Sequence, residues 1–148
     1  MSQVTDTKFF LECIDRALSH LFIQRRFDVI RLFTGREAKV ILLYLIMRFY
    51  YHEQLGSVQI GEIPTKEFLF KKVGNASSRL SISKFIDSMV ETGVLIKKTA
   101  TFDKRKSILR PSVILVNEFE SMHLQRNQKL KDLSKNKEAV SLNSLLFM

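Results

Sequence analysis

Apolar residues recur at helical spacing through much of the chain and predict its main elements. Between residues 77 and 93 they fall three and four positions apart, at Ile82, Phe85, Ile86, Met89 and Val90, as on one face of an α-helix. Ser77 or Ser78 can cap the start of this helix, and Gly93 can end it. The opposite side carries Ser81, Lys84, Asp87 and Ser88, together with an unexpected Leu80. The pattern therefore predicts an amphipathic helix with a polar and basic outer face.

A strongly basic β-hairpin is predicted directly after this helix. Residues 94–101 are rich in β-forming side chains, and residues 107–109 resume a strand. The tip between them holds three consecutive cations, Lys104, Arg105 and Lys106. Such a tip fits a DNA backbone or a minor groove, where concentrated negative potential attracts Arg. The alternative is a solvated charge run that keeps an edge hairpin from aggregating.

Helices are also predicted before this segment. A first helix begins near Asp6 and bends at residues 25–26. Thr34 and Glu37 form a capping box that opens a helix to about residue 52. Because this helix is apolar nearly all round, we expect it to be buried on most sides. Residues 58–60 read as a short strand, and Thr65 caps a further helix that ends at the turn of residues 74–76.

The C-terminal part is predicted to be helical and to end in apolar residues. A long helix is expected over residues 112–133, followed by an exposed polar joint at residues 134–138. Five apolar side chains then follow, at Val140, Leu142, Leu145, Leu146 and Phe147. A chain this small would struggle to cover them alone, which favours a second copy as their partner.

The net charge of +9 points to a polyanionic partner. Residues 65–110 hold eleven Lys and Arg against four Asp and Glu, so this segment alone carries +7. Charge this concentrated exceeds what solubility requires. Together with the helix and the basic hairpin, it favours nucleic acid as the partner.

The sequence offers no chemistry that would indicate an enzyme. His20, His52 and His123 are scattered, without the spacing of a metal site or a catalytic triad, so neither a metal nor another cofactor is expected. Cys13, the only cysteine, excludes an internal disulfide and favours a reducing compartment. Because Cys13 lies on the apolar stripe of the first helix, we expect an inert buried thiol rather than a redox switch.

The chain is expected in the cytoplasm, at the nucleoid. Its first six residues lack the cationic segment of a signal peptide. The longest apolar run, residues 40–47, is too short to span a bilayer. No membrane partner is therefore expected.

Over roughly residues 34–119 the chain resembles the MarR family of winged helix-turn-helix regulators. The resemblance rests on the helix that ends at Gly74, the Ser-rich start of the next helix, residues 93–96 and the hairpin tip. Asp103 and Arg105 look like the family's D-x-R wing element, and residues 109–111 stand where its second wing strand usually ends. The turn between the two helices is about two residues longer than is usual in the family.

The resemblance implies a mainly α (α+β) fold: a winged helix-turn-helix with N- and C-terminal dimerisation helices. The expected organisation is a single domain over residues 1–148, with helical dimerisation parts at 5–52 and 112–148 and a DNA-binding part at 55–111. A homodimer would place two recognition helices about 34 Å apart on a pseudo-palindromic site in double-stranded DNA. The positions expected to meet DNA are Ser77, Ser78, Arg79, Ser81, Ser83 and Lys84 from the helix, and Asp103, Lys104, Arg105 and Lys106 from the hairpin.

Within this set, Arg105 would enter the minor groove while Asp103 holds its guanidinium. Besides a dimeric transcriptional regulator, two alternatives stay open. One is a winged-helix DNA-binding protein of replication or of plasmid or phage maintenance, and the other is a winged-helix protein-interaction module. A small-molecule effector is compatible with the resemblance, but no residues of the sequence point to one.

Overall fold

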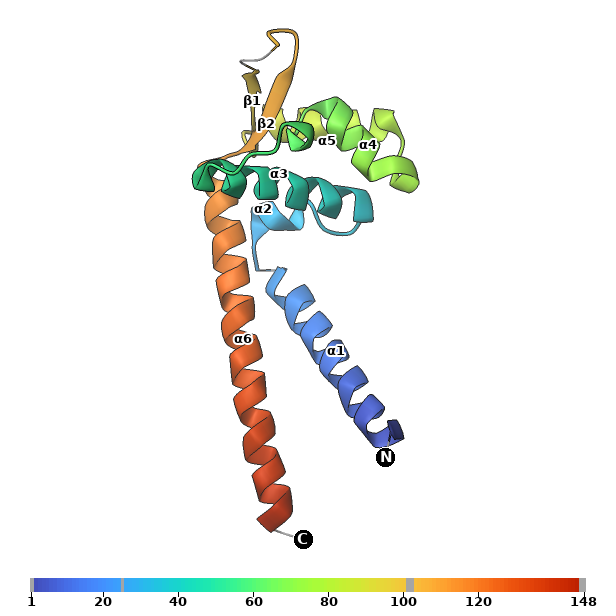
Figure 1. Cartoon of the computed structure of the whole chain (residues 1–148), viewed down its shortest axis with the longest axis vertical. Helices are drawn as coiled ribbons and strands as arrows, with labels where there is room; N and C mark the ends of the chain where they lie inside the picture. Colours follow the sequence, from blue (N-terminus) through green and yellow to red (C-terminus); the bar gives the residue numbers. More distant parts are fainter. Residues whose placement is uncertain (1, 25, 101–102, 147–148) are drawn as a thin grey trace. The chain divides into compact units, whose positions relative to one another are not determined.

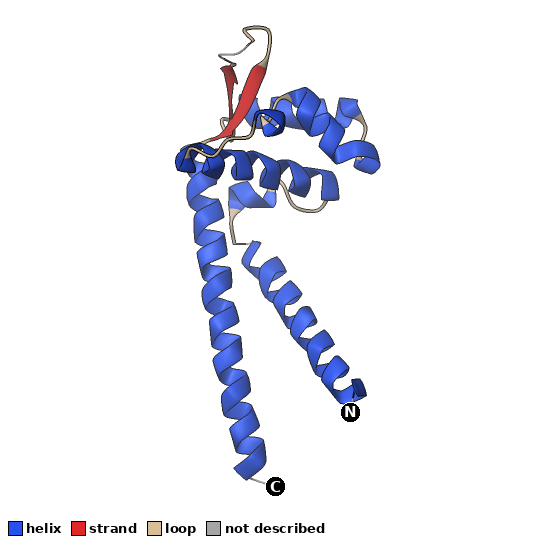
Figure 2. Ribbon diagram, viewed as in Figure 1, coloured by secondary structure: helices blue, strands red, loops and turns tan. Residues whose placement is uncertain are grey.

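A computed structural model describes residues 2–24, 26–100 and 103–146, with side chains described except at residues 2–5, 60 and 133–146. The main helices are α1 (Ser2–Gln24), α3 (Glu37–Leu55), α4 (Lys66–Val73), α5 (Arg79–Glu91) and α6 (Val113–Leu146). The short helix α2 (Asp28–Arg31) and the 3₁₀ turns η1 (Ile60–Glu62) and η2 (Gly74–Ala76) lie between them. Strands β1 (Leu95–Thr99) and β2 (Ser107–Pro111) pair as a hairpin (Figures 1 and 2). The mainly helical winged fold predicted from the sequence is confirmed.

The chain forms two compact units, residues 28–118 and residues 1–27 with 119–148. The first, here called the winged unit, contains helices α2 to α5, the hairpin and the start of α6. The expected division had grouped residues 37–52 with the dimerisation helices. In the structure α3 packs against α4 and β2 instead, so it belongs to the winged unit.

Helix α3 is the centre of the winged unit, which explains why its sequence is apolar nearly all round. Leu42, Ile46 and Met47 are fully buried. Phe49 joins the hairpin residues Ala100 and Ile108 in one core cluster. The helix is therefore covered both by helices and by the sheet, as its pattern predicts.

The helix-turn-helix forms where the sequence predicts it. Thr65 caps α4 by accepting a hydrogen bond from the Phe68 N–H (3.2 Å), and Gly74 leaves the helix at φ +60°. Ser78 caps α5 by accepting from the Ser81 N–H (3.1 Å). Gly93, at φ +81°, turns the chain out of α5 toward β1, a conformation that glycine adopts without steric cost.

The hairpin pairs β1 and β2 antiparallel, from Leu95 opposite Pro111 to Thr99 opposite Ser107. The strand expected at residues 58–60 is wrong, because residues 60–62 form the 3₁₀ turn η1. The Glu62 N–H bonds locally to the Gln59 carbonyl (3.1 Å) and so cannot join a sheet. A bond from the Leu109 N–H to the Pro64 carbonyl (3.0 Å) links this segment to β2.

Two predicted helix starts are also wrong. Helix α1 begins at Ser2, so Asp6 lies inside it and does not cap it. The Thr34 hydroxyl donates to the Arg31 carbonyl (2.8 Å), where it closes the end of α2. It therefore makes no capping box, and Arg36 stands at the N-cap of α3 without a side-chain bond.

In the unit of residues 1–27 and 119–148, α1 exposes a broad apolar face. Seven of its large apolar side chains are 43–61% exposed, at Phe9, Phe10, Leu11, Ile14, Leu18, Leu21 and Phe22. The predicted joint at residues 134–138 is wrong, since α6 continues unbroken through it. Of the expected apolar tail, Phe147 lies outside the described residues; residues 140–146 are described only as helix backbone.

Candidate nucleic-acid interface

Helix α5 presents one polar face to solvent and buries the other. Ile82, Ile86 and Met89 are buried, as their spacing predicts. Ser81, Lys84, Asp87 and Ser88 are exposed on the other side, and Leu80 is 65% exposed among them. A helix with a free polar and basic face is suited to enter a groove of duplex DNA.

The structure separates the serines at the start of α5 into different environments. Ser78 and Ser81 are exposed, with their hydroxyls 3.0 Å apart, while Ser77 is half-buried. The Ser83 hydroxyl accepts a hydrogen bond from Lys66 Nζ (3.1 Å), which also pairs with Asp87 (2.8 Å). Ser83 is thus held against α4, and Lys66, which the sequence analysis did not single out, joins the two helices.

The tip of the hairpin is organised by Asp103. Its Oδ1 accepts from the backbone N–H of Arg105 (3.0 Å) and lies 3.4 Å from Arg105 Nε. The Asp103 carbonyl accepts from the Lys106 N–H (3.0 Å), which closes the turn. The expected contact between Asp103 and the Arg105 guanidinium is therefore present. Lys104, Arg105 and Lys106 are all exposed, with the Arg105 side chain 92% exposed.

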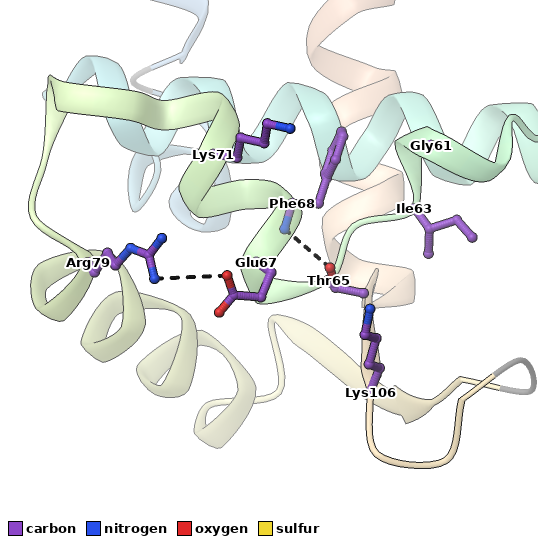
Figure 3. A pocket seen from close by; sticks show the side chains of 8 residues that line it. All are labelled: Gly61, Ile63, Thr65, Glu67, Phe68, Lys71, Arg79 and Lys106. Atoms are coloured by element: carbon purple, nitrogen blue, oxygen red, sulfur yellow. Dashed lines mark hydrogen bonds and ion pairs between the residues drawn. The ribbon is translucent and has the colours of Figure 1, made fainter.

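A surface hollow of about 430 Å³ lies between α4, the start of α5 and the tip of the hairpin (Figure 3). The residues that line it include the apolar Ile63 and Phe68 and the cations Lys71, Arg79 and Lys106. Arg79 Nη1 lies 3.9 Å from Glu67, and the Arg79 guanidinium stacks 5.5 Å from the Phe70 ring centre. The first turn of α5, α4 and the hairpin thus share one basic surface.

Cys13 is exposed, so the prediction of a buried thiol is wrong. Helix α1 does have the apolar face on which Cys13 was predicted to lie, but much of that face is exposed. Burial therefore does not protect this thiol in a single copy of the chain.

Within the ranges that the structure describes, no group of three or more His, Cys, Asp or Glu is placed to hold a metal ion. His20 and His123 do come together, with ring centres 6.3 Å apart. Burial lowers the pKa of both, and the nearby Arg126 lowers each further. Among the described helices, none is both long enough and apolar enough to cross a membrane.

No family model matches the chain, and no curated protein matches it either. Solved structures do match it along nearly its whole length. The transcriptional regulator Tm0710 of Thermotoga maritima has a TM-score of 0.60 at 12% identity, over 97% of this chain and 89% of that one. Two mutant forms of MepR from S. aureus match with TM-scores of 0.55 and 0.51, both at 12% identity. They cover 95% and 90% of this chain and 94% and 90% of their own.

At such identities the likeness concerns the fold, and it agrees with the helix-turn-helix and hairpin described above. These solved structures belong to MarR-family regulators. The chain therefore has the winged-helix fold of MarR-type transcriptional regulators.

Proposed function

We propose that this chain binds double-stranded DNA as a homodimeric transcriptional regulator, with α5 in the major groove and the hairpin at the minor groove. The observation that carries the proposal is the shared basic surface of the winged unit. Lys84 on α5 and the three cations of the hairpin tip are exposed on elements of one compact unit, in which α5 packs against β1. Exposed cations on such a rigid frame suit the regular spacing of phosphates and grooves.

The two elements have different roles in this proposal. Ser81 and Lys84 on the outer face of α5 reach base edges, where sequence is legible in the major groove. Arg105 reaches the minor groove, and Asp103 orients its guanidinium by a charge-assisted bond. Ser77, Ser78 and Arg79 lie near the start of α5, where backbone phosphates approach. Lys104 and Lys106 add phosphate contacts at the hairpin.

The dimer is proposed from the uncovered apolar face of α1. Seven large apolar side chains on that helix are substantially exposed, and contiguous apolar patches of this kind mark interaction sites. A second copy supplies an identical face, so a twofold arrangement covers both at once. Two copies of α5 would then lie about one DNA turn apart and read a pseudo-palindrome. Such a regulator acts in the cytoplasm, at the nucleoid.

The fold likeness supports this proposal, since Tm0710 is described as a transcriptional regulator. The experiment that tests it is fluorescence anisotropy with random duplex DNA and with a duplex selected from genomic fragments, at low and high salt. Arg105→Ala should weaken binding to both duplexes. It should also lower the slope of log K against log salt by about 0.9 per subunit.

Lys84→Ala separates base reading from backbone binding. If Lys84 reads a guanine, its loss should cost about 1–3 kcal/mol on the selected duplex and much less on random DNA. Lys131→Ala, which removes one exposed charge from α6, is the matched control and should change neither affinity. An Arg105→Ala protein with unchanged affinities and slope would show that the hairpin is not a DNA-binding wing.

A further inference from the structure

A second hollow adjoins the one in Figure 3 and extends it along the hairpin. It encloses about 220 Å³ and includes Lys97, Arg105 and Ser107. The two hollows share Thr65, Glu67 and Lys106 in their walls. They therefore form one continuous depression between α4, α5 and the hairpin, here called the basic trough.

The charges along the basic trough are very unequal. Six cations line it, namely Lys66, Lys71, Arg79, Lys97, Arg105 and Lys106. Among the described residues that line it, the one acid is Glu67. Figure 3 shows Glu67 directed at Arg79 across the first hollow, with the two charged groups 3.9 Å apart.

The basic trough lies where a DNA strand must pass, if the proposed function holds. A major groove and the adjacent minor groove are separated by one phosphodiester strand. With α5 in the first groove and the hairpin at the second, that strand crosses the surface between them. The basic trough occupies this surface, and its cations match the strand in sign.

Resting on that proposed function, we propose that the basic trough binds this phosphodiester strand and that Glu67 is its counter-charge. Without DNA, Glu67 pairs with Arg79. When a phosphate of the strand binds, it replaces Glu67 as the partner of Arg79, and the Glu67 carboxylate repels it. The side chains of Glu67 and Arg79 are 73% and 74% exposed, so their contact is weak and a phosphate can replace it.

The decisive variant is Glu67→Gln, which removes the charge and keeps the size of the side chain. The full-length protein is measured by anisotropy on random and selected duplexes at low and high salt. Glu67→Gln should bind both duplexes about two- to fivefold more tightly at low salt. Its salt slope should steepen by up to about 0.9 per subunit, since the trough gains one net positive charge.

Glu91→Gln is the matched control, because Glu91 is exposed at the end of α5 and does not line the basic trough. It loses the same charge and should give a clearly smaller gain. Lys71→Ala and Lys97→Ala should each flatten the slope on both duplexes. In an Arg79→Ala background the gain from Glu67→Gln should shrink, because the pair no longer exists.

Several outcomes would overturn the inference while leaving the proposed function intact. In the first, the wild type binds DNA, but Glu67→Gln gains no more affinity than Glu91→Gln does. In the second, the salt slopes of Lys71→Ala and Lys97→Ala both equal that of the wild type. An undiminished gain in the Arg79→Ala background would overturn the pairing of Glu67 with Arg79. A wild type that binds no duplex even at low salt would instead overturn the proposed function, and the inference with it.

Discussion

Helices α5 and α1 are both amphipathic, but the rest of the chain covers the apolar face of α5 and leaves most of the apolar face of α1 exposed. Ile82, Ile86 and Met89 of α5 are at most 5% exposed. Seven large apolar side chains of α1 are about half exposed, and Ile23 at its end is buried. Spacing therefore predicts that a helix forms and which face is apolar, while the rest of the chain decides what covers that face.

The same contrast extends to the two units. Of the buried apolar residues that are described, all but Ile23 and Met122 lie in the winged unit. The winged unit thus has its own core, whereas the unit that contains α1 has an uncovered surface. Each of the following predictions tests that difference.

A charge on the apolar face of α1 should have the largest effect. In a symmetric dimer, Ile14→Asp removes two apolar side chains from the proposed interface, one from each subunit. Because each such burial contributes about 1.5–3 kcal/mol, the dissociation constant should rise at least about a hundredfold. Sedimentation velocity across a concentration series measures it. Leu55→Asp, at an 80% exposed position at the end of α3, should leave the dimer intact.

A cavity in the core of the winged unit should have the second-largest effect, here on the free energy of unfolding. Ile86 is 1% exposed, so Ile86→Ala should lower the free energy of unfolding by about 2–5 kcal/mol. Leu80→Ala, on the exposed side of the same helix, should change it by less than about 0.5 kcal/mol. Urea unfolding followed by circular dichroism compares the two. Equal losses would mean that α5 does not bury the face described here.

The helix caps should show a smaller difference. Ser78→Ala removes the hydroxyl that accepts the Ser81 N–H at the start of α5. The loss should lower the free energy of unfolding by about 1 kcal/mol. Ser88→Ala, at an exposed position on the same helix, is the control and should cost less. A Ser88→Ala protein that is the less stable of the two would contradict this role for Ser78.

Acid should loosen the unit that contains α1 before the winged unit. Burial, reinforced by Arg126, lowers the pKa of His20 and His123 from the ordinary 6.5. The unfolded chain therefore takes up protons first as the pH falls through 6.5. Stability is full above that value and declines until the pH passes the lowered pKa of the folded state.

Hydrogen exchange of α1 amides should thus accelerate as the pH falls below 6.5, after correction for the intrinsic rates. A His20→Gln, His123→Gln double variant should lose this acceleration, while His52→Gln should retain it. Identical pH profiles in the double variant and the wild type would contradict a role for these two imidazoles.

The winged unit was largely predictable from sequence because its signals are local. The Ser78 cap, the Gly93 exit and the cationic hairpin each depend on residues close together in the chain. The exposure of Cys13 was not predictable, since it depends on what covers α1. The roles of Lys66 and Glu67 were missed because their partners Asp87 and Arg79 lie on the next helix. Sequence spacing gave no signal for those pairs.

The contact between Val29 and Glu118 holds the two ends of the winged unit together. Both carboxylate oxygens of Glu118 accept from the Val29 N–H, at 3.1 and 3.2 Å, although the residues are 89 positions apart. Val29 follows the first residue of that unit, and Glu118 is its last residue. The two ends of the unit therefore lie side by side. Adjacent ends make a segment easy to transplant, because a host loop can receive it without stretching. Residues 28–118 could thus be grafted as a cassette into an unrelated scaffold.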